Sequence, residues 1–229
     1  MLQMMLATSL LTIASLQVNA ASVTECGTDV CFTYDNATLF GSANIIGNNI
    51  FFLPTNFIAE SNNGDGAASA NSTLSILVEA ITEGFAMTQF VLQEQGDYFL
   101  SGSSASASVG GMFAATSGTK TCESMFFPCR EEEILNSSPL TTLDAFDDWS
   151  INSVISLAGN ESWNSDSKVF LTIENRLSAT TLENGDQAFI QKKVAGVGIT
   201  VVPVPAAVWL MGSALGILGW MRRKSISIS

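Results

Sequence analysis

The sequence predicts an all-β protein, a jelly-roll-like antiparallel β-sandwich that lies between two uncharged, apolar ends. From Phe32 to Val202, apolar and polar residues alternate with a dominant period of two, which places one face of each strand in a core and the other in water. Turn-forming residues recur between the alternating runs. No segment between the two ends keeps a helical period for more than about three turns, and parallel sheets need helical crossovers, so the strands are expected to pair antiparallel.

The N-terminal end predicts a signal helix over residues 1–20. The first 24 residues carry no charged side chain, and Met4–Leu16 is an apolar run about as long as the hydrophobic region of a signal peptide. Val18 and Ala20 have the branched and small side chains that signal peptidase accepts at the third and first positions before its cut. Cleavage is therefore expected between Ala20 and Ala21. A buried core helix is the alternative.

Four cysteines, Cys26, Cys31, Cys122 and Cys129, form two close pairs along the chain. An even number of cysteines in an exported protein indicates disulfides. Of the three possible connectivities, proximity favours Cys26 with Cys31 and Cys122 with Cys129, and each small loop would stabilise the fold by about 2 kcal/mol. A zinc site is the alternative, but the gaps of four and six residues are wide for zinc knuckles, so no metal is expected.

The segment 21–200 is predicted to be one acidic ectodomain of about nine strands with a single core. Three runs show the alternation most clearly, with these residues on one face: Leu74, Ile76 and Val78; Trp149, Ile151 and Ile155; Val169, Leu171 and Ile173. Turns are predicted at Gly47-Asn48-Asn49, Asn62-Asn63-Gly64-Asp65-Gly66, Glu83-Gly84, Gln95-Gly96-Asp97, Gly110-Gly111 and Asn184-Gly185.

Two stretches of the ectodomain each admit two interpretations. Ser101–Ser108 has the composition of a flexible linker, but Ala105 and Ala107 alternate with serines, and a strand of small side chains is favoured. Residues 131–146 begin with Glu131-Glu132-Glu133, which suits the start of a short helix or a solvated charge run. Because Pro139 interrupts the segment, a long connection between two halves of the sandwich is favoured over the helix.

The charged residues are unevenly distributed, and they exclude several classes of function. The chain has 9 basic and 21 acidic side chains, a net charge of -12 and no histidine. All 21 acidic residues lie between Glu25 and Asp186. A nucleic-acid binder needs a basic face to displace counterions, so no nucleic-acid partner is expected. Without histidine, Ser-His-Asp triads, Cys-His dyads and imidazole metal sites are excluded, and no cofactor is expected.

Carboxylates are the remaining candidates for catalysis in the ectodomain. Glu94 with Asp97, or Asp147 with Asp148, could serve as acid and base in glycoside hydrolysis if their side chains flanked a cleft. The sequence Gln-Glu-Gln-Gly-Asp around Glu94 equally suits the end of one strand, a turn and the start of the next, with its carboxylates in solvent. The solvated interpretation is favoured, so the ectodomain is expected to lack catalysis of its own.

Two other groups of residues suggest binding rather than catalysis. Asn62, Asn63 and Asp65 form an oxygen-rich loop that could bind calcium, but they match no EF-hand spacing, and a plain turn is favoured. Trp149 or Trp163, displayed on a face of the sandwich, could stack on sugars. Packing in the core is the commoner fate of tryptophan, and it is the alternative here.

The C-terminal end predicts a transmembrane helix over residues 206–221. These sixteen residues are uncharged and would span roughly 24 Å as a helix, somewhat less than a hydrocarbon core of about 30 Å. Trp209 and Trp220 lie near the two ends, where indole rings favour the membrane interface. The basic cluster Arg222, Arg223 and Lys224 follows at once and is expected to stay in the cytoplasm, so that the acidic ectodomain faces outward.

The segment 201–229 as a whole resembles a protein-sorting signal. A Pro-x-Pro motif, a short apolar helix and a basic stop follow one another at the C-terminal end of the sequence. The chain reads Val-Pro-Val-Pro-Ala-Ala-Val-Trp-Leu, which resembles the VPxPA variant of the PEP-CTERM signal, with Val204 in place of the glutamate of its namesake. The matching residues are Val202, Pro203, Val204, Pro205, Ala206, Ala207, Trp209 and Leu210.

This resemblance implies a substrate of an exosortase, a membrane-embedded cysteine protease or transpeptidase of Gram-negative bacteria. Such proteins are exported across the inner membrane, held by the C-terminal helix, cut near the Pro-x-Pro motif and passed to the cell surface or the exopolysaccharide matrix. The expected partners are then the membrane, signal peptidase, the exosortase and exopolysaccharide. Because prolines resist sheet pairing, the Pro-x-Pro segment is expected to be extended and accessible. Glu94–Tyr98 and Phe189–Lys193 also loosely resemble ectodomains that carry this signal.

Overall fold

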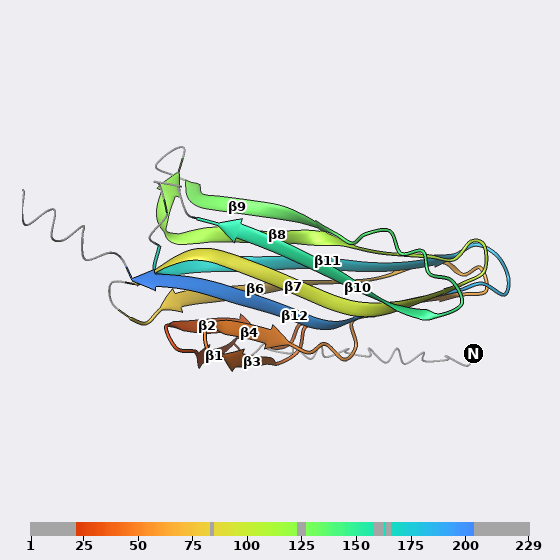
Figure 1. Ribbon diagram of the computed structural model, residues 1–229, viewed down its shortest axis with the longest axis horizontal. Coiled ribbons are helices and arrows are strands. Elements are labelled where there is room, and N and C mark those ends of the chain that lie inside the picture. The colour runs from red at the N-terminus through yellow and green to blue at the C-terminus, as the bar shows by residue number, and fades with distance from the viewer. Residues whose placement is uncertain (1–21, 83–84, 123–126, 158–162, 164–165, 204–229) are drawn as a thin grey trace, which may run out of the picture.

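A computed structural model describes residues 22–82, 85–122, 127–157, 163 and 166–203 (Figure 1). These residues form twelve β-strands, and their pairings are all antiparallel, as predicted. Within the described ranges, no helix is both long enough and apolar enough to cross a membrane. The predicted signal helix over 1–20 and the predicted transmembrane helix over 206–221 lie outside these ranges.

The strands form two sheets that pack as a β-sandwich. Sheet A has the order β1 (Ser22–Cys26), β2 (Val30–Asp35), β6 (Gly66–Ala80), β11 (Lys168–Thr181), β8 (Ser106–Cys122) and β9 (Phe127–Asn136). Sheet B has the order β10 (Phe146–Ser156), β7 (Phe85–Ser101), β12 (Gln187–Pro203), β4 (Asn49–Phe52) and β3 (Ala43–Ile46), and β5 (Ile58–Asn62) also pairs with β12. β11 and β12 each lie inside their sheet rather than at its edge.

The long strands run along the length of the molecule (Figure 1). The chain passes repeatedly between the sheets, because β6, β8 and β11 belong to sheet A while β7, β10 and β12 belong to sheet B. The turns that join β5 to β6, β7 to β8 and β11 to β12 gather at one end, and β12 ends at the other (Figure 1). At the turn end, the carboxylate of Asp186 accepts a hydrogen bond from the Ser104 backbone N–H at 2.8 Å, which ties two of these turns together.

The core consists of the inward residues of the alternating runs. Each of the three predicted runs is confirmed, since Leu74, Ile76 and Val78 on β6 and Val169, Leu171 and Ile173 on β11 are fully buried, and Trp149, Ile151 and Ile155 on β10 are nearly so. Each buried aliphatic side chain of this size contributes about 1.5–3 kcal/mol relative to an exposed one. The alternation therefore fixes both the strands and the face that each turns to the other sheet.

Several of the predicted turns are present, but two other turn predictions are wrong. Gly47, Gly64 and Gly185 have φ angles of 61°, 79° and 94° and lie in the turns predicted for them. Gly96 and Gly111 instead lie within β7 and β8. A Cβ on Gly96 would lie 1.9 Å from Gln191 O, and a Cβ on Gly111 would lie 1.9 Å from Glu174 O. These two glycines therefore permit close approach between neighbouring strands instead of forming turns.

Two other expectations need correction. Ser101–Ser108 is not one strand: β7 ends at Ser101, Gly102 has a φ of 92°, and β8 begins at Ser106. Glu131-Glu132-Glu133 belongs to β9, so the helix and the long connection are both wrong there, and only residues 137–145 connect two strands. β9 is an edge strand of sheet A, and exposed carboxylates along an edge oppose pairing with another chain.

Each close pair of cysteines forms a disulfide. Cys26 is bonded to Cys31 within the β1–β2 hairpin, and Cys122 at the end of β8 is bonded to Cys129 of β9. This is the connectivity that proximity favours. Disulfides persist in oxidising compartments, so the pair of bonds fits an extracellular or periplasmic protein.

Candidate functional site

The first predicted carboxylate pair is not a pair. Glu94 and Asp97 point to opposite faces of β7, because they are three residues apart on a strand. Glu94 lies between the sheets with 0% of its surface exposed, so the expectation that it lies in solvent at a turn is wrong. Asp97 faces outward, 2.6 Å from Lys193 Nζ. The two carboxylates cannot act together as acid and base on one substrate.

The second pair, Asp147 and Asp148, lies at the start of β10 and is exposed. Asp147 accepts hydrogen bonds from Thr142 Oγ1 at 2.5 Å, from the Asp148 backbone N–H at 2.9 Å and from Tyr98 Oη at 3.2 Å. These donors favour the charged form and lower the pKa of Asp147, with the Thr142 hydroxyl contributing most. Asp147 is therefore held as a carboxylate, which suits a structural role better than that of a general acid.

The residues considered for binding are two tryptophans, for sugars, and the Asn62–Gly66 loop, for calcium. Trp149 and Trp163 are buried, with 3% and 0% of their surface exposed, so neither is displayed for stacking on a sugar. Trp149 Nε1 donates instead to Gln191 O at 3.0 Å. Asn62–Gly66 forms the β5–β6 turn, where Asn63 has a φ of 53°, in agreement with the plain turn that the sequence favours.

Only the first two residues of the sorting motif lie in the described part of the chain. Val202 and Pro203 end β12 and pair with Ala86 and Phe85 of β7. The expectation that the Pro-x-Pro segment escapes the sheet is therefore wrong for Pro203, which is tolerated because it stands at the end of its strand. The other sorting residues lie outside the described ranges, as do the basic cluster and the signal cleavage residues: Val204, Pro205, Ala206, Ala207, Trp209, Leu210, Arg222, Arg223, Lys224, Ala20 and Ala21.

A polar cluster that the sequence analysis did not identify lies between the two sheets. Lys192 on β12, Glu94 on β7 and Asn175 on β11 have 1%, 0% and 3% of their surface exposed. Glu94 and Lys192 belong to sheet B, and Asn175 belongs to sheet A. Buried charges are rare unless they are paired, so these three residues form the candidate functional site.

Each member of the cluster occupies an inward position in an apolar run. Asn175 continues the buried series of β11, between Ile173 and Leu177. On β12, a register shift between Lys192 and Val194 marks a β-bulge. Before this bulge the even-numbered residues point inward, and after it the odd-numbered ones do. The bulge therefore leaves Lys192 inside and its neighbour Lys193 outside.

The three side chains form a closed triangle of contacts. Lys192 Nζ lies 2.6 Å from Glu94 Oε1 and donates a hydrogen bond to Asn175 Oδ1. Asn175 Nδ2 donates to Glu94 Oε2 at 3.0 Å. The carboxylate thus contacts both the amine and the amide nitrogen, while the amine also contacts the amide oxygen.

Aromatic rings surround the amine. Lys192 Nζ lies 5.2 Å from the ring centre of Phe40, 5.5 Å from that of Phe57 and 5.8 Å from that of Trp149. The Lys192 backbone N–H also donates to Phe57 O at 3.0 Å, which fixes the strand beside the rings. The rings attract a cation, but they also keep water away. Burial lowers the pKa of Lys192 to about 8, although the nearby Glu94 carboxylate favours its charged form.

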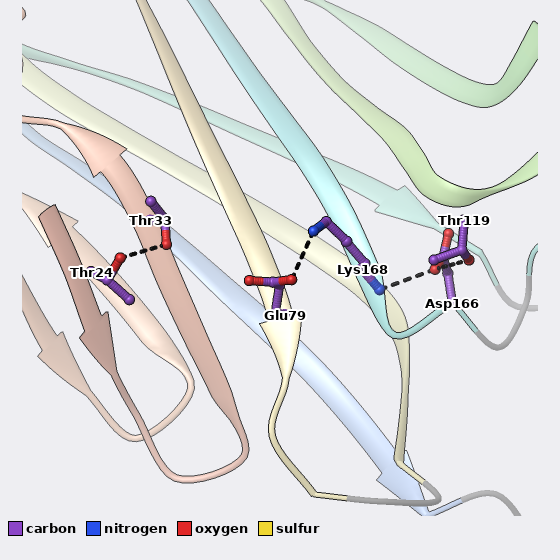
Figure 2. A network of polar contacts seen from close by, with 6 residues as sticks. All are labelled: Thr24, Thr33, Glu79, Thr119, Asp166 and Lys168. Carbon is purple, nitrogen blue, oxygen red and sulfur yellow. Dashed lines mark hydrogen bonds and ion pairs between the residues drawn. The ribbon is translucent and has the colours of Figure 1, made fainter. Parts of the chain in front are cut away.

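A second buried carboxylate, Asp166, lies just before β11 (Figure 2). It accepts hydrogen bonds from Thr119 Oγ1 at 2.7 Å, from the Lys168 backbone N–H at 3.0 Å and from Ser117 Oγ. Lys168 Nζ turns away to Glu79 Oε1 on β6, at 2.9 Å (Figure 2). Asp166 therefore holds the start of β11 against β8, where the pairing of β8 with β9 shifts register between Thr116 and Thr121.

Comparisons with known proteins add little to this picture. No protein-family model and no curated protein matches the chain. Among solved structures, the chain is similar to one in the structure of infectious bursal disease virus Gt strain, with 9% sequence identity and a TM-score of 0.30. The match covers 83% of this chain and 44% of the viral chain, so this chain spans less than half the length of the protein it matches.

Proposed function

We propose that the chain is an exported protein of the cell surface or of a biofilm and exopolysaccharide matrix, without catalysis of its own. It crosses the inner membrane with the signal peptide over 1–20, is held there by the helix over 206–221, and is processed by an exosortase at the sorting signal. The observation that carries this proposal is the run from Val202 to Leu210, followed by an apolar segment and Arg222-Arg223-Lys224. The two disulfides support the exported location.

The fold is compatible with such a protein. A jelly-roll-like winding of the sandwich is part of the proposal, supported by the long strands that pass between the sheets. β12 brings the chain to Pro203, the second residue of the motif, so the rest of the signal follows directly on a sheet strand. The processing enzyme would thus meet its motif next to a rigid body.

The C-terminal end of the mature protein tests this proposal. Mass analysis of C-terminal peptides should find an end upstream of Ala206 in cells that contain an exosortase, and only there. Pro203→Ala with Pro205→Ala should block the cut, whereas Pro139→Ala, in the connection between β9 and β10, should not. A chain that ends at Ser229 in both kinds of cell contradicts the proposal.

A second candidate function is carbohydrate binding. The residues that would contact the sugar are three phenylalanines, because the two tryptophans first considered for this role are buried. Phe146 is 69% exposed, and its ring centre lies 5.2 Å from that of Phe99 and 6.1 Å from that of Phe189. Exposed aromatic rings offer flat apolar faces on which sugar rings can stack. Phe146→Ala should weaken retention on matrix polysaccharide if this candidate is right, and Phe127→Ala, which removes an exposed phenylalanine from β9, serves as the matched control.

A further inference from the structure

We propose that the amine of Lys192 and the side-chain amide of Asn175 join in an intramolecular isopeptide bond, with Glu94 as the catalytic residue. The bond replaces Asn175 Nδ2 by Lys192 Nζ and releases ammonia. What carries the proposal is the closed triangle of amine, amide and carboxylate, buried between the two sheets. The proposal concerns the ectodomain and does not depend on the sorting signal.

The amine is placed to act as a nucleophile. Only the neutral form of lysine has a free electron pair for attack, and removal from water favours that form. Lys192 lies among the rings of Phe40, Phe57 and Trp149, and burial lowers its pKa to about 8. Glu94 Oε1, 2.6 Å from Nζ, is positioned to take the proton. That transfer converts an ion pair into a neutral amine and a neutral acid, which apolar surroundings tolerate better.

The amide is placed to be attacked. Asn175 Oδ1 accepts a hydrogen bond from Lys192 Nζ, so the amine lies against the amide carbonyl before any bond forms. Asn175 Nδ2, the group that must leave, donates to Glu94 Oε2 at 3.0 Å. Holding both reactants in one orientation removes the entropic cost of bringing them together, which is a substantial part of such a barrier.

The atoms and charges of the reaction balance without a cofactor. Lys192 first gives one proton to Glu94, and the neutral Nζ then attacks Asn175 Cγ while the carbonyl electron pair moves onto Oδ1. Glu94 returns its proton to Nδ2 and takes the remaining surplus proton from Nζ. The carbonyl re-forms and the Cγ–Nδ2 bond breaks. Ammonia leaves as the neutral molecule, and Glu94 keeps the proton that it took from Nζ, so a neutral acid remains beside the new amide in the core.

The surroundings favour this product. Water that could hydrolyse the amide is excluded by the packed sheets, and a neutral amide replaces a charged amine in the core. The bond would join β12 of sheet B to β11 of sheet A, so that the two sheets are connected covalently through the core. The disulfides, by contrast, each connect strands of one sheet.

Peptide mapping of the full-length protein tests the proposal. After reduction and trypsin digestion, an unlinked chain yields peptides 169–176 and 177–192, because trypsin cuts after Arg176 and after Lys192. A linked chain cannot be cut at Lys192. It yields peptide 169–176 joined to 177–193, lighter than their sum by one ammonia molecule.

The joining of the two peptides, rather than the mass loss alone, is the criterion. Asn184 precedes Gly185 in the second peptide and can itself lose ammonia by cyclising. Fragment ions must therefore place the link between Asn175 and Lys192. If trypsin does not cut after Arg176, next to the modified asparagine, both linked residues remain in the single peptide 169–193, and the link closes a loop within it. Fragment ions then distinguish this loop from a peptide in which Asn184 has cyclised.

Variants separate the chemistry from the fold. Lys192→Arg and Asn175→Ala should each abolish the linked peptide, and Glu94→Gln, which keeps the size of the side chain, should lower its yield at least about tenfold. Lys193→Arg changes the neighbouring exposed lysine and should leave the yield unchanged. Circular dichroism and intact disulfides show that each variant has folded.

Two results would overturn the inference. Recovery of unmodified peptides 169–176 and 177–192 in full yield from the folded wild-type protein shows that no bond forms. Formation of the link in folded Glu94→Gln at the wild-type rate removes Glu94 from the catalytic role.

Discussion

Replacing Gly96 by alanine should destabilise the protein strongly, because the space for a Cβ is occupied. An ideal Cβ at Gly96 would lie 1.9 Å from Gln191 O and 2.6 Å from Trp149 Nε1, whereas ordinary contacts begin at 3.4 Å. β7 and β12 would therefore have to separate by about 1.5 Å at this point, since neither atom is the end of a flexible side chain. The same two atoms share the hydrogen bond from Trp149 Nε1 to Gln191 O.

The expected cost follows from these two effects. Overpacking of a well-packed core costs about 1–3 kcal/mol, and loss of the hydrogen bond adds about 1 kcal/mol. Gly96→Ala should thus lower the free energy of unfolding by about 2–4 kcal/mol. The matched control is Gly110→Ala on β8, where the nearest atoms lie 3.7 Å from the added Cβ. Because alanine restricts the unfolded chain more than glycine does, the control should be neutral or stabilise by up to about 1 kcal/mol.

Equilibrium unfolding in urea, followed by circular dichroism, measures both changes on the same scale. The reasoning is refuted if Gly96→Ala changes the free energy of unfolding by less than about 0.5 kcal/mol, the usual range of a surface substitution. It is equally refuted if Gly110→Ala destabilises as much as Gly96→Ala, because the contacts at Gly96 would then not be the cause.

Three other predictions concern charge and covalent structure. Replacing both cysteines of the Cys122–Cys129 disulfide by alanine should lower the free energy of unfolding by about 2–3 kcal/mol in urea, and the variant should no longer respond to a reducing agent at this bond. In the Asn175→Ala background, where no link can form and Lys192 keeps its amine, Lys192→Met should cost about 3–5 kcal/mol, since it leaves the buried Glu94 without its partner. Lys193→Met in the same background removes a side chain that is 53% exposed and should cost less than about 1 kcal/mol, and equal losses would contradict the assigned burial. The lowered pKa of Asp147 means that its stabilising contribution is complete above pH 3.8 and disappears as the pH falls through the folded-state value. The urea midpoint of the wild type should therefore fall more between about pH 6 and about pH 3 than that of Asp147→Asn.

The sequence predicted the sandwich well because its signal is local. Leu74, Ile76 and Val78 alternate with polar neighbours on one strand, and such a period requires no knowledge of the partner strands. Glycine carries less information. Gly47 forms a turn and Gly96 lies inside a strand, and the difference depends on Gln191, a residue of another strand far along the chain. The predictions at Gln95–Asp97 and Gly110-Gly111 failed for this reason.

The buried cluster escaped prediction for a related reason. Glu94 lies at an inward position of its run, two residues after the buried Leu92, so its own strand did contain a signal. On β12, the bulge between Lys192 and Val194 reverses which alternate residues point inward. The alternation of apolar and polar residues along the sequence therefore does not show that Lys192 is buried. Asn175 is a polar residue between the inward positions of Ile173 and Leu177, and its side-chain type alone does not indicate burial. The meeting of these side chains depends on the packing of two sheets, which no local pattern encodes.

The pairing of β12 with β7 as far as Pro203 has a mechanical consequence. A pull applied at Pro203 along the strand loads the hydrogen bonds between β12 and β7 in shear, because these bonds lie across the strand direction. Bonds loaded in this way share the force and must break together, whereas a strand peeled sideways loses its bonds one at a time. Since β12 is also held by β4 and β5 on its other side, tension applied at this end of the strand enters the sheet at an interior strand, where sliding meets resistance from both neighbours.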